Sequence, residues 1–469
     1  MSLQKHVSKL TIYHKTLLII STLIPLYYLS YRFHPTYGLL NTSKPKSVSH
    51  VYKPKEFQSL WLSTHLLSPF NPSPIRAFCA QATWRPNLIF NLADANGGVG
   101  NVRAEFLDFL FYAMEAGASI VLPGMARRNE EKLFDVWGAG RAEFETMFDR
   151  EWFVESLGEA CPEMRVWESV EAAMEAGHAK KVEGMYRPEV PFARRDTTRE
   201  KWLEETESWL KDKGVDLGSE DGNLTVVDVG RTMWEVDTRD TRPGLRLNLP
   251  MVLRINPNVR KFAGAAMAAL EQMFHGHFNQ PLVPTDKLHR RAFYGAHLRT
   301  EADTVDAGWQ TPCSETECGL NWTTQTDEYM QHAVLNSLKI IYVASGNATE
   351  IERFKVKAAA NSPRLTVVDK WDLLTEEQSA ELKKLHWDQQ ALVDLEILMR
   401  CSVFGGMAKS SFAFMIAMAR STWMEEQRYV MDPWAAKHKE AFVTFENKLN
   451  KIWGRNQLNE ERVPKGAWP

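Results

Sequence analysis

Two short segments, far apart in the chain, constrain the fold more than any other feature of the sequence. Asp94–Arg103 (DANGGVGNVR) lies between an apolar run and an amphipathic helix pattern, and His297–Asp303 (HLRTEAD) follows another apolar run. Each is typical of a buried strand that ends in a loop with backbone amides and an arginine. Ligands of open α/β proteins bind at the carboxyl ends of parallel strands. Two such places predict two facing domains with a cleft between them.

The apolar patterns around these segments alternate between strand and helix. Leu88–Leu92 predicts a buried strand, Val102–Gly117 a helix and Ala118–Pro123 a second strand, which together seed a parallel sheet. A middle region predicts helices near 143–160 and 199–214 and a strand at 224–229. A second series follows, with strands at 292–298, 339–344, 365–369 and 402–405 and helices near 326–338, 350–361, 389–400 and 410–421.

This alternation favours the α/β fold class, with two Rossmann-like, doubly wound domains that face a cleft. At 469 residues, of which 44% are hydrophobic, the chain is long enough to bury two cores. We expect the first domain at 86–284 and the second at 285–469, with the boundary near the proline-containing linker Asn279–Pro284.

The N-terminal region contains an uncharged apolar run, Thr16–Tyr31, between Lys15 and Arg32. A spanning helix needs about 20 residues, and the flanking basic side chains can extend this shorter run by reaching the membrane surface. We expect a cytosolic tail at 1–15, a signal anchor at 16–33 that inserts in the lipid bilayer, and a Pro-, Ser- and Thr-rich stem at 34–85. The rest of a single-pass type II protein then lies in the lumen of the Golgi or the ER. A cleaved signal peptide and a buried core helix are the alternatives.

Composition and short patterns bear on this placement. The formal net charge is −3, and no basic run interleaves with aromatic residues, so nucleic acid is not an expected partner. Four triplets fit the pattern of N-glycosylation acceptors and agree with a lumenal location, at Asn41, Asn223, Asn321 and Asn347.

The five cysteines give one local expectation. Cys313 and Cys318 lie close together in a polar stretch, which favours a local disulfide, with free thiols as the alternative. The sequence alone does not pair Cys79, Cys161 or Cys401, and an odd count leaves at least one cysteine unpaired within the chain.

The glycine-rich segment is suited to close approach of the backbone to an anionic ligand. Gly97, Gly98 and Gly100 allow a tight turn, and the N-terminus of the following helix offers free amides. Asn101 and Arg103 add side-chain donors. A glycine turn that only connects a strand to a helix is the alternative. The spacing is not that of a dinucleotide-binding loop, because Arg103 stands where the third glycine belongs.

The second segment places His297 and Arg299 on one face of a strand end, because side chains alternate along a strand. An arginine in this position can bind a diphosphate through two hydrogen bonds and stabilise a leaving group as negative charge develops. Glu301 and Asp303 are suited to binding hydroxyl groups, or to neutralising Arg299 in a structural ion pair.

A third group of polar residues lies near the end of the second series. Asp394 lies on the helix before the short strand at 402–405, and Ser410, Ser411 and Phe412 open the next helix. Hydroxyls and amides at a helix N-terminus suit phosphate oxygens, and an upstream carboxylate suits a base or ribose. The alternative is that one of the serines only caps its helix.

The order of these three groups is more specific than any one of them. Gly-Gly-x-Gly-Asn-x-Arg, then His-x-Arg-x-Glu, then an Asp-bearing helix followed by Ser-Ser-Phe resembles the GDP-fucose protein O-fucosyltransferase superfamily over residues 87 to 421. The resemblance implies a GT-B fold, with the donor bound mainly to the C-terminal domain and the acceptor near the cleft. It also implies an inverting enzyme that needs no metal, and the chain contains no Asp-x-Asp triplet of the kind that holds a metal-bound diphosphate.

The resemblance also assigns expected roles to single residues. Asn101, with Gly98 and Gly100, would lie near the sugar and diphosphate of the donor. Arg299 would contact the diphosphate and assist the departure of GDP, and His297 would support the same loop and contact the nucleotide. The guanine or ribose would face Asp394, and the phosphates and ribose would be held by Ser410, Ser411 and Phe412.

The catalytic base is the point at which the sequence departs from the family. Some members carry a carboxylate just before the Gly-x-Asn step, where this chain has Gly98, and Asp94 is the nearest substitute. We therefore expect a glycosyltransferase that moves fucose from GDP-fucose to a hydroxyl of an unknown protein, glycan or small molecule. Three alternatives are an enzyme that uses another nucleotide sugar, a catalytically silent lumenal binding protein, and a Rossmann-type enzyme that does not act on sugars. No nucleophile elbow or dinucleotide fingerprint supports the last of these.

Overall fold

The structure is a computed structural model of the 469-residue chain. It describes residues 51–64, 70–133, 135, 138–176, 180–185, 199–215, 224–230, 236, 238, 243–278, 280–310, 317–318, 320–422, 443–456 and 466–469. The predicted tail and anchor, residues 34–50 and 65–69 of the predicted stem, Asn41, Asn223 and Cys313 lie outside these residues. Among the described helices, none combines the length and apolarity that crossing a membrane requires.

The first sheet forms from the elements predicted around the glycine segment. Its strand order is β5-β2-β1-β7-β6, and every neighbouring pair is parallel. All four residues of β1 are buried, as expected for a parallel sheet covered on both faces. The strands are β1 (Leu88–Asn91), β2 (Ser119–Val121), β5 (Val166–Trp167), β6 (Lys180–Met185) and β7 (Thr225–Val229). The sequence patterns missed β5 and β6, because short strands carry too few residues for a clear period.

The helices and small elements that accompany this sheet run from residue 54 to residue 277. The helices are α2 (Pro54–Ser63), α3 (Ser73–Cys79), α4 (Val99–Ala116), α5 (Arg150–Ala160), α6 (Val170–Glu175), α7 (Arg199–Asp212), α8 (Pro243–Asn248) and α9 (Pro257–Phe274). The small elements are β3 (Met125–Ala126), β4 (Arg141–Ala142) and the 3-10 turns η1 (Phe144–Thr146), η2 (Leu249–Val252) and η3 (His275–His277).

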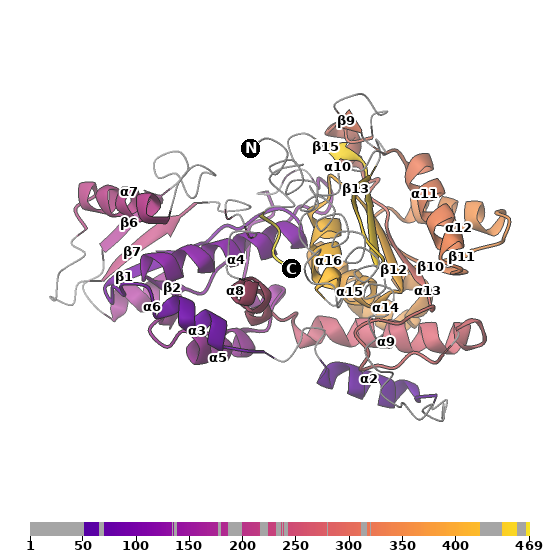
Figure 1. Ribbon diagram of the computed structural model, residues 1–469, viewed down its shortest axis with the longest axis horizontal. Helices are drawn as coiled ribbons and strands as arrows, with labels where there is room; N and C mark the ends of the chain where they lie inside the picture. Colours follow the sequence, from indigo (N-terminus) through magenta and orange to yellow (C-terminus); the bar gives the residue numbers. More distant parts are fainter. Residues whose placement is uncertain are drawn as a thin grey trace, which may run out of the picture. The chain divides into compact units, whose positions relative to one another are not determined.

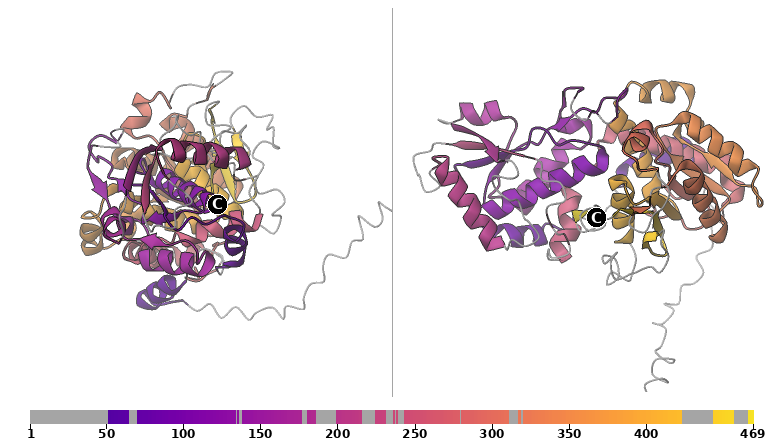
Figure 2. Two further views of the ribbon diagram at one scale, coloured as in Figure 1. Left: turned by 90° about the vertical axis from the view of Figure 1, so that its left-hand side faces the viewer. Right: turned by 90° about the horizontal axis from the view of Figure 1, so that it is seen from above.

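The second sheet has the order β11-β10-β8-β12-β14-β13, and only the edge pair β13–β14 is antiparallel. Figures 1 and 2 show it in orange and yellow as a layer separate from the purple to pink first sheet. The expected α/β class with parallel sheets is therefore confirmed. The strands are β8 (Tyr294–His297), β10 (Ile340–Ala344), β11 (Thr366–Val368), β12 (Val403–Met407), β13 (Val443–Glu446) and β14 (Asn450–Trp453), with β9 (Glu317–Cys318) pairing β15 (Arg455–Asn456) apart from it.

The helices of this second part match most of the predicted ranges. They are α10 (Ala302–Asp306), α11 (Trp322–Leu335), α12 (Ala348–Ala359), α13 (Lys370–Leu373), α14 (Glu376–Leu382), α15 (Trp387–Arg400) and α16 (Ser411–Ser421). The sequence did not predict α9, which packs along α15 and α2 (Figure 1). Because α9 precedes residue 284 but packs on a helix of the second part, the expected domain boundary there stays a prediction.

Two contacts join segments that are distant in the sequence within the first part of the fold. A disulfide joins Cys79 in α3 to Cys161 at the end of α5, across 82 residues of sequence, so the end of the predicted stem packs on the first sheet's helices. The indole of Trp468, almost fully buried, donates a hydrogen bond from Nε1 to Asp108 of α4 at 2.7 Å. Cys401 is a buried free thiol.

Candidate functional site

One cavity brings the three predicted groups of residues together. Its volume is about 530 Å³, and both parts of the fold line it. Of the residues that the sequence selected, twelve border it: Gly97, Gly98, Gly100, Asn101, His297, Arg299, Glu301, Asp303, Asp394, Ser410, Ser411 and Phe412. Asp94 is not among the lining residues. Its half-exposed carboxylate pairs with Arg141, Oδ1 to Nε at 2.6 Å, so the role of Asp94 as a base stays a prediction.

The start of α4 forms one wall of this cavity, and its glycines are needed for steric reasons. Gly97 has φ +96°, and a Cβ there would lie 2.3 Å from the Asn101 side chain. At Gly100, in the first turn of the helix, a Cβ would lie 2.8 Å from the backbone N of Phe412 and from the backbone C of Ser411. Glycine therefore lets the N-terminal turns of α4 and α16 meet backbone to backbone.

The start of α16 forms the facing wall. The Oγ of Ser410 accepts a hydrogen bond from the amide of Ala413 at 3.3 Å and contacts Nδ1 of His297 at 3.3 Å. The cap predicted as an alternative role for Ser410 is thus present, and the same serine borders the cavity. Two helix N-termini at one cavity favour binding of an anion there. Both direct free backbone amides and the positive ends of their helix dipoles toward the cavity.

Arg299 lies at the end of β8 and is held by two carboxylates. Its Nη1 contacts Glu301 Oε2 at 2.5 Å and Asp303 Oδ1 at 2.9 Å, while its Nη2 contacts Asp303 Oδ2 at 2.6 Å. Of the two alternatives for these acids, the structure shows the ion pair. Burial alone would lower the pKa of Arg299, but the two carboxylates outweigh burial and raise it, so the guanidinium stays charged.

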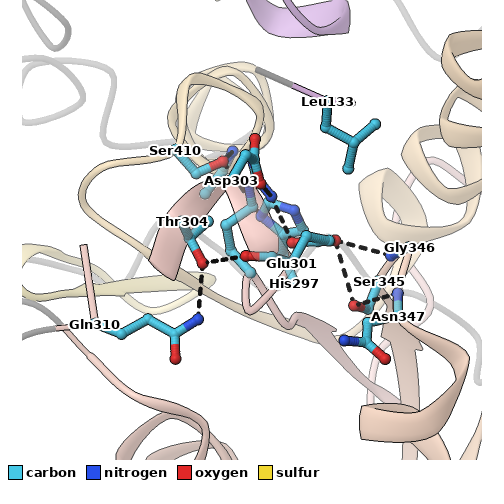
Figure 3. A network of polar contacts seen from close by, with 12 residues as sticks. Leu133, His297, Glu301, Asp303, Thr304, Gln310, Ser345, Gly346, Asn347 and Ser410 are labelled. Carbon is cyan, nitrogen blue, oxygen red and sulfur yellow. Dashed lines mark hydrogen bonds and ion pairs between the residues drawn. The ribbon is translucent and has the colours of Figure 1, made fainter. Parts of the chain in front are cut away.

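Glu301 is fixed from the opposite side by the loop after β10. Its Oε1 accepts hydrogen bonds from the amide of Gly346 at 2.8 Å and from the hydroxyl of Ser345 at 3.3 Å (Figure 3). Burial would raise the pKa of Glu301, but the charge of Arg299 and the Gly346 amide prevail and lower it to about 2. The arginine that borders the cavity is therefore pre-positioned by the ends of two neighbouring strands.

His297 is the last residue of β8, two residues before Arg299, and is buried. Burial lowers its pKa to about 4, more than the Glu301 charge raises it, so the ring is neutral near pH 7. The ring lies 4.8 Å from the Phe412 ring between centroids, and the His297 carbonyl accepts a 2.8 Å hydrogen bond from Tyr329. A neutral imidazole here can exchange hydrogen bonds with a ligand without adding charge.

Asp394 is a buried residue of α15 that borders the cavity. Its Oδ2 contacts Lys370 Nζ at 2.6 Å, and its Oδ1 accepts a 2.7 Å hydrogen bond from the Tyr342 hydroxyl. Burial raises the pKa of Asp394 although the Lys370 charge acts in the opposite direction. Lys370 directly follows the predicted strand at 365–369. A position at the carboxyl end of a parallel strand is a sequence signal that could have identified it as a candidate site residue.

The cavity lining also includes ionisable residues to which the sequence assigned no role, among them Arg128 and Asp388. Arg128 comes from the loop after β3, where no periodic pattern exists to place it. Asp388 lies in the first turn of α15, and burial raises its pKa to about 6 against the effect of the Arg128 charge.

Arg103, which the sequence suggested as a side-chain donor for the ligand, points toward the C-terminal residues of the chain. Its guanidinium donates to the backbone carbonyls of Trp468 at 3.1 Å and Pro469 at 2.5 Å, and it does not border the 530 Å³ cavity. The reason is that it lies one turn into α4, facing the C-terminal residues that pack on that helix. Across the part of the chain that the structure describes, His, Cys, Asp and Glu side chains form no group of three suited to hold a metal ion.

The contact at Gly100 gives a stability prediction. Gly100→Ala should lower the free energy of unfolding by about 1–3 kcal/mol, because the new methyl group meets backbone that cannot move aside cheaply. Gly98→Ala is the matched control, since its Cβ would meet only the Arg128 side chain, at 3.3 Å. Urea denaturation of both variants measures the difference, and equal stability of Gly100→Ala and the wild type would contradict the packing argument.

The buried imidazole of His297 gives a pH prediction. Between pH 7 and pH 5 the unfolded chain protonates this histidine at about 6.5 while the folded chain does not, so stability falls as pH falls. His297→Asn should therefore reduce the loss of unfolding free energy over this range by about 2 kcal/mol. His277→Asn, at a surface position in η3, serves as the control. A pH dependence of denaturation that is the same in wild type and His297→Asn would refute this prediction.

Several solved structures resemble this chain at low identity. POFUT1 in complex with GDP-fucose is 12% identical, with 72% of this chain and 96% of that chain covered and a TM-score of 0.44. NodZ alpha-1,6-fucosyltransferase soaked with GDP-fucose is 14% identical, with 72% and 92% covered and a TM-score of 0.36. A fucosyltransferase NodZ from Bradyrhizobium is 13% identical, with 71% and 90% covered and a TM-score of 0.35.

The family comparison is more specific than these structural ones. No curated protein sequence matches the chain. The sequence model described as GDP-fucose protein O-fucosyltransferase matches residues 88–422. This range includes every predicted site residue and most of the chain, and the chain therefore belongs to the GDP-fucose protein O-fucosyltransferase family.

Proposed function

We propose that the protein transfers fucose from GDP-fucose to a hydroxyl group of a protein or glycan. The acceptor oxygen forms a bond to C1 of fucose, while the bond between C1 and the β-phosphate oxygen breaks and its electron pair leaves with GDP. The hydroxyl proton passes to a base. Attack on the face opposite the departing GDP inverts the configuration at C1.

One observation carries this proposal. The cavity that contains Arg299 is also the meeting point of the N-terminal turns of α4 and α16, in contact at Gly100. A diphosphate is the part of a nucleotide sugar that such a place recognises, because amides, helix dipoles and a guanidinium all favour negative charge. The same groups stabilise the diphosphate most strongly when GDP leaves, which is when its charge is greatest.

The part of the cavity lining formed by Lys370 and Asp394 suits the nucleoside. Lys370 and Asp394 supply a donor and an acceptor side by side, joined at 2.6 Å. The edge of guanine presents a carbonyl acceptor for the lysine and two N–H donors for the carboxylate, so this pair matches guanine. Adenine presents an N–H donor where guanine has the carbonyl, and an acceptor at N1 where guanine has a donor. In this proposal Ser410, Ser411 and Phe412, which also border the cavity, contact phosphate and ribose.

The fold and location of the enzyme follow from the same proposal. Two parallel sheets with a cavity lined from both parts of the fold support a GT-B arrangement. The Cys79–Cys161 disulfide supports a lumenal location in the Golgi or ER, because disulfides persist in oxidising compartments. In this proposal residues 16–33 anchor the protein in the membrane, and no metal takes part in the transfer.

Arg299 provides the direct test of function. Arg299→Ala should weaken GDP binding roughly 10- to 100-fold, because charge-assisted hydrogen bonds to the diphosphate are lost. It should also slow release of GDP from GDP-fucose by about 100-fold or more. Isothermal titration calorimetry and a GDP-release assay of the full-length protein measure both effects.

Three controls sharpen this test. Arg353→Ala removes an exposed arginine of α12 outside the cavity and should change neither quantity. EDTA should leave both unchanged if no metal is needed. GDP-mannose and UDP-sugars test the other donors. Wild-type protein that binds none of these nucleotides would overturn the proposal, and binding without any turnover would favour a silent binding protein.

The lumenal location gives a separate prediction. Asn321 is exposed at the start of α11, so it is accessible for the attachment of a glycan. Expression in a eukaryotic secretory pathway should give a protein that needs detergent for extraction and that shifts in size after endoglycosidase treatment. Asn321→Gln should remove part of that shift, and a protein extracted without detergent and carrying no glycan would contradict this location.

A further inference from the structure

We propose that Arg128 contacts the terminal phosphate of the donor's diphosphate together with Arg299, so that both parts of the fold hold the leaving group. This inference rests on the proposed function, since it requires that the cavity binds a nucleoside diphosphate. It adds a ligand-binding residue that the sequence motifs did not contain.

Arg128 lies against the wall of the cavity that the start of α4 forms. It lies in the loop after β3, and its side chain is only 13% exposed. Its Nε donates to the carbonyl of Leu133 at 2.9 Å, which fixes the plane of the guanidinium. A Cβ built on Gly98, the N-cap of α4, would lie 3.3 Å from its Nη1. The charged group therefore lies at the helix start that forms one wall of the cavity.

Arg128 and Arg299 converge on the same atom. Nη2 of Arg128 contacts Asp303 Oδ2 at 3.0 Å, and Nη2 of Arg299 contacts that oxygen at 2.6 Å. Arg128 comes from the first part of the fold and Arg299 from the end of β8 in the second. Asp303 thus holds two guanidiniums next to each other although they lie far apart in the sequence.

Arg128 keeps donor capacity for a ligand. Its Nε and Nη2 are occupied by Leu133 and Asp303, whereas Nη1 has no hydrogen-bond partner among the described residues and the residue borders the cavity. Burial lowers the pKa of Arg128, and the nearby Arg299 charge acts in the same direction. A diphosphate between the two arginines would stabilise both charges with charge-assisted hydrogen bonds.

The loop that carries Arg128 is also held against α15. Arg127 Nη2 contacts His386 Nδ1 at 3.0 Å, and Glu130 accepts a 3.1 Å hydrogen bond from the amide of Trp387. Arg127 does not border the cavity, so it is a control of the same residue type in the same loop. Comparing variants of Arg127 and Arg128 therefore separates a lost contact with the ligand from a change in the conformation of the loop.

Calorimetric titration with GDP and with GMP tests the proposal, because GMP lacks the terminal phosphate. In the full-length protein, Arg128→Gln should weaken GDP binding roughly 10-fold or more and GMP binding less than about threefold. Arg128→Lys should recover part of the GDP affinity, since it restores the charge but not the planar fork. Arg127→Gln should bind both nucleotides as the wild type does, and thermal unfolding confirms that each variant is folded.

A double-mutant cycle with Asp303→Asn distinguishes contact from support. If Arg128 touches the phosphate, Arg128→Gln still weakens GDP binding roughly 10-fold in the Asp303→Asn background. An effect that disappears in that background shows that Arg128 acts only by holding Asp303, and this overturns the proposal. Equal loss of GDP and GMP binding, or no loss of either, also overturns it. Wild-type protein that binds neither nucleotide overturns the proposed function itself, whereas GDP binding that depends on Arg299 but not on Arg128 overturns only this inference.

Discussion

The backbone contact between the first turns of α4 and α16 is the constraint on which the site depends. Gly100 permits it, because any larger residue would place a Cβ 2.8 Å from the backbone of Ser411 and Phe412. The contact brings two sets of free helix amides, which come from different parts of the fold, to one cavity of about 530 Å³. Neither helix start alone would surround a diphosphate.

Ion pairs next to this contact hold the charged side chains of the site in position. Arg299 and Arg128 share Asp303, and Glu301 is tied to the loop after β10 through Gly346. Each of the two guanidiniums is paired with a carboxylate, so the protein's own side chains fix their positions. A buried charge needs such partners, because an unpaired one costs far more than a hydrogen bond returns.

Much of the site could be predicted because its residues follow local rules. Asn101, Arg299 and Ser410 each lie where a strand ends or a helix begins, and the alternation of apolar residues marks those points in the sequence. Arg128 could not be found in this way, since it lies in a loop without period and its place depends on Asp303, 175 residues away. The Cys79–Cys161 pair, 82 residues apart, was beyond reach for the same reason.

The sequence by itself determined the α/β class, the elements around each motif and the kinds of side chain available for chemistry. Only the tertiary structure decided which of them meet. It turned Arg103 toward the carbonyls of the C-terminal residues, paired Asp94 with Arg141 and brought Arg128 beside Arg299. The physical reason is that periodicity and turn chemistry report the conformation of a few neighbouring residues, whereas these contacts depend on how distant helices and loops pack.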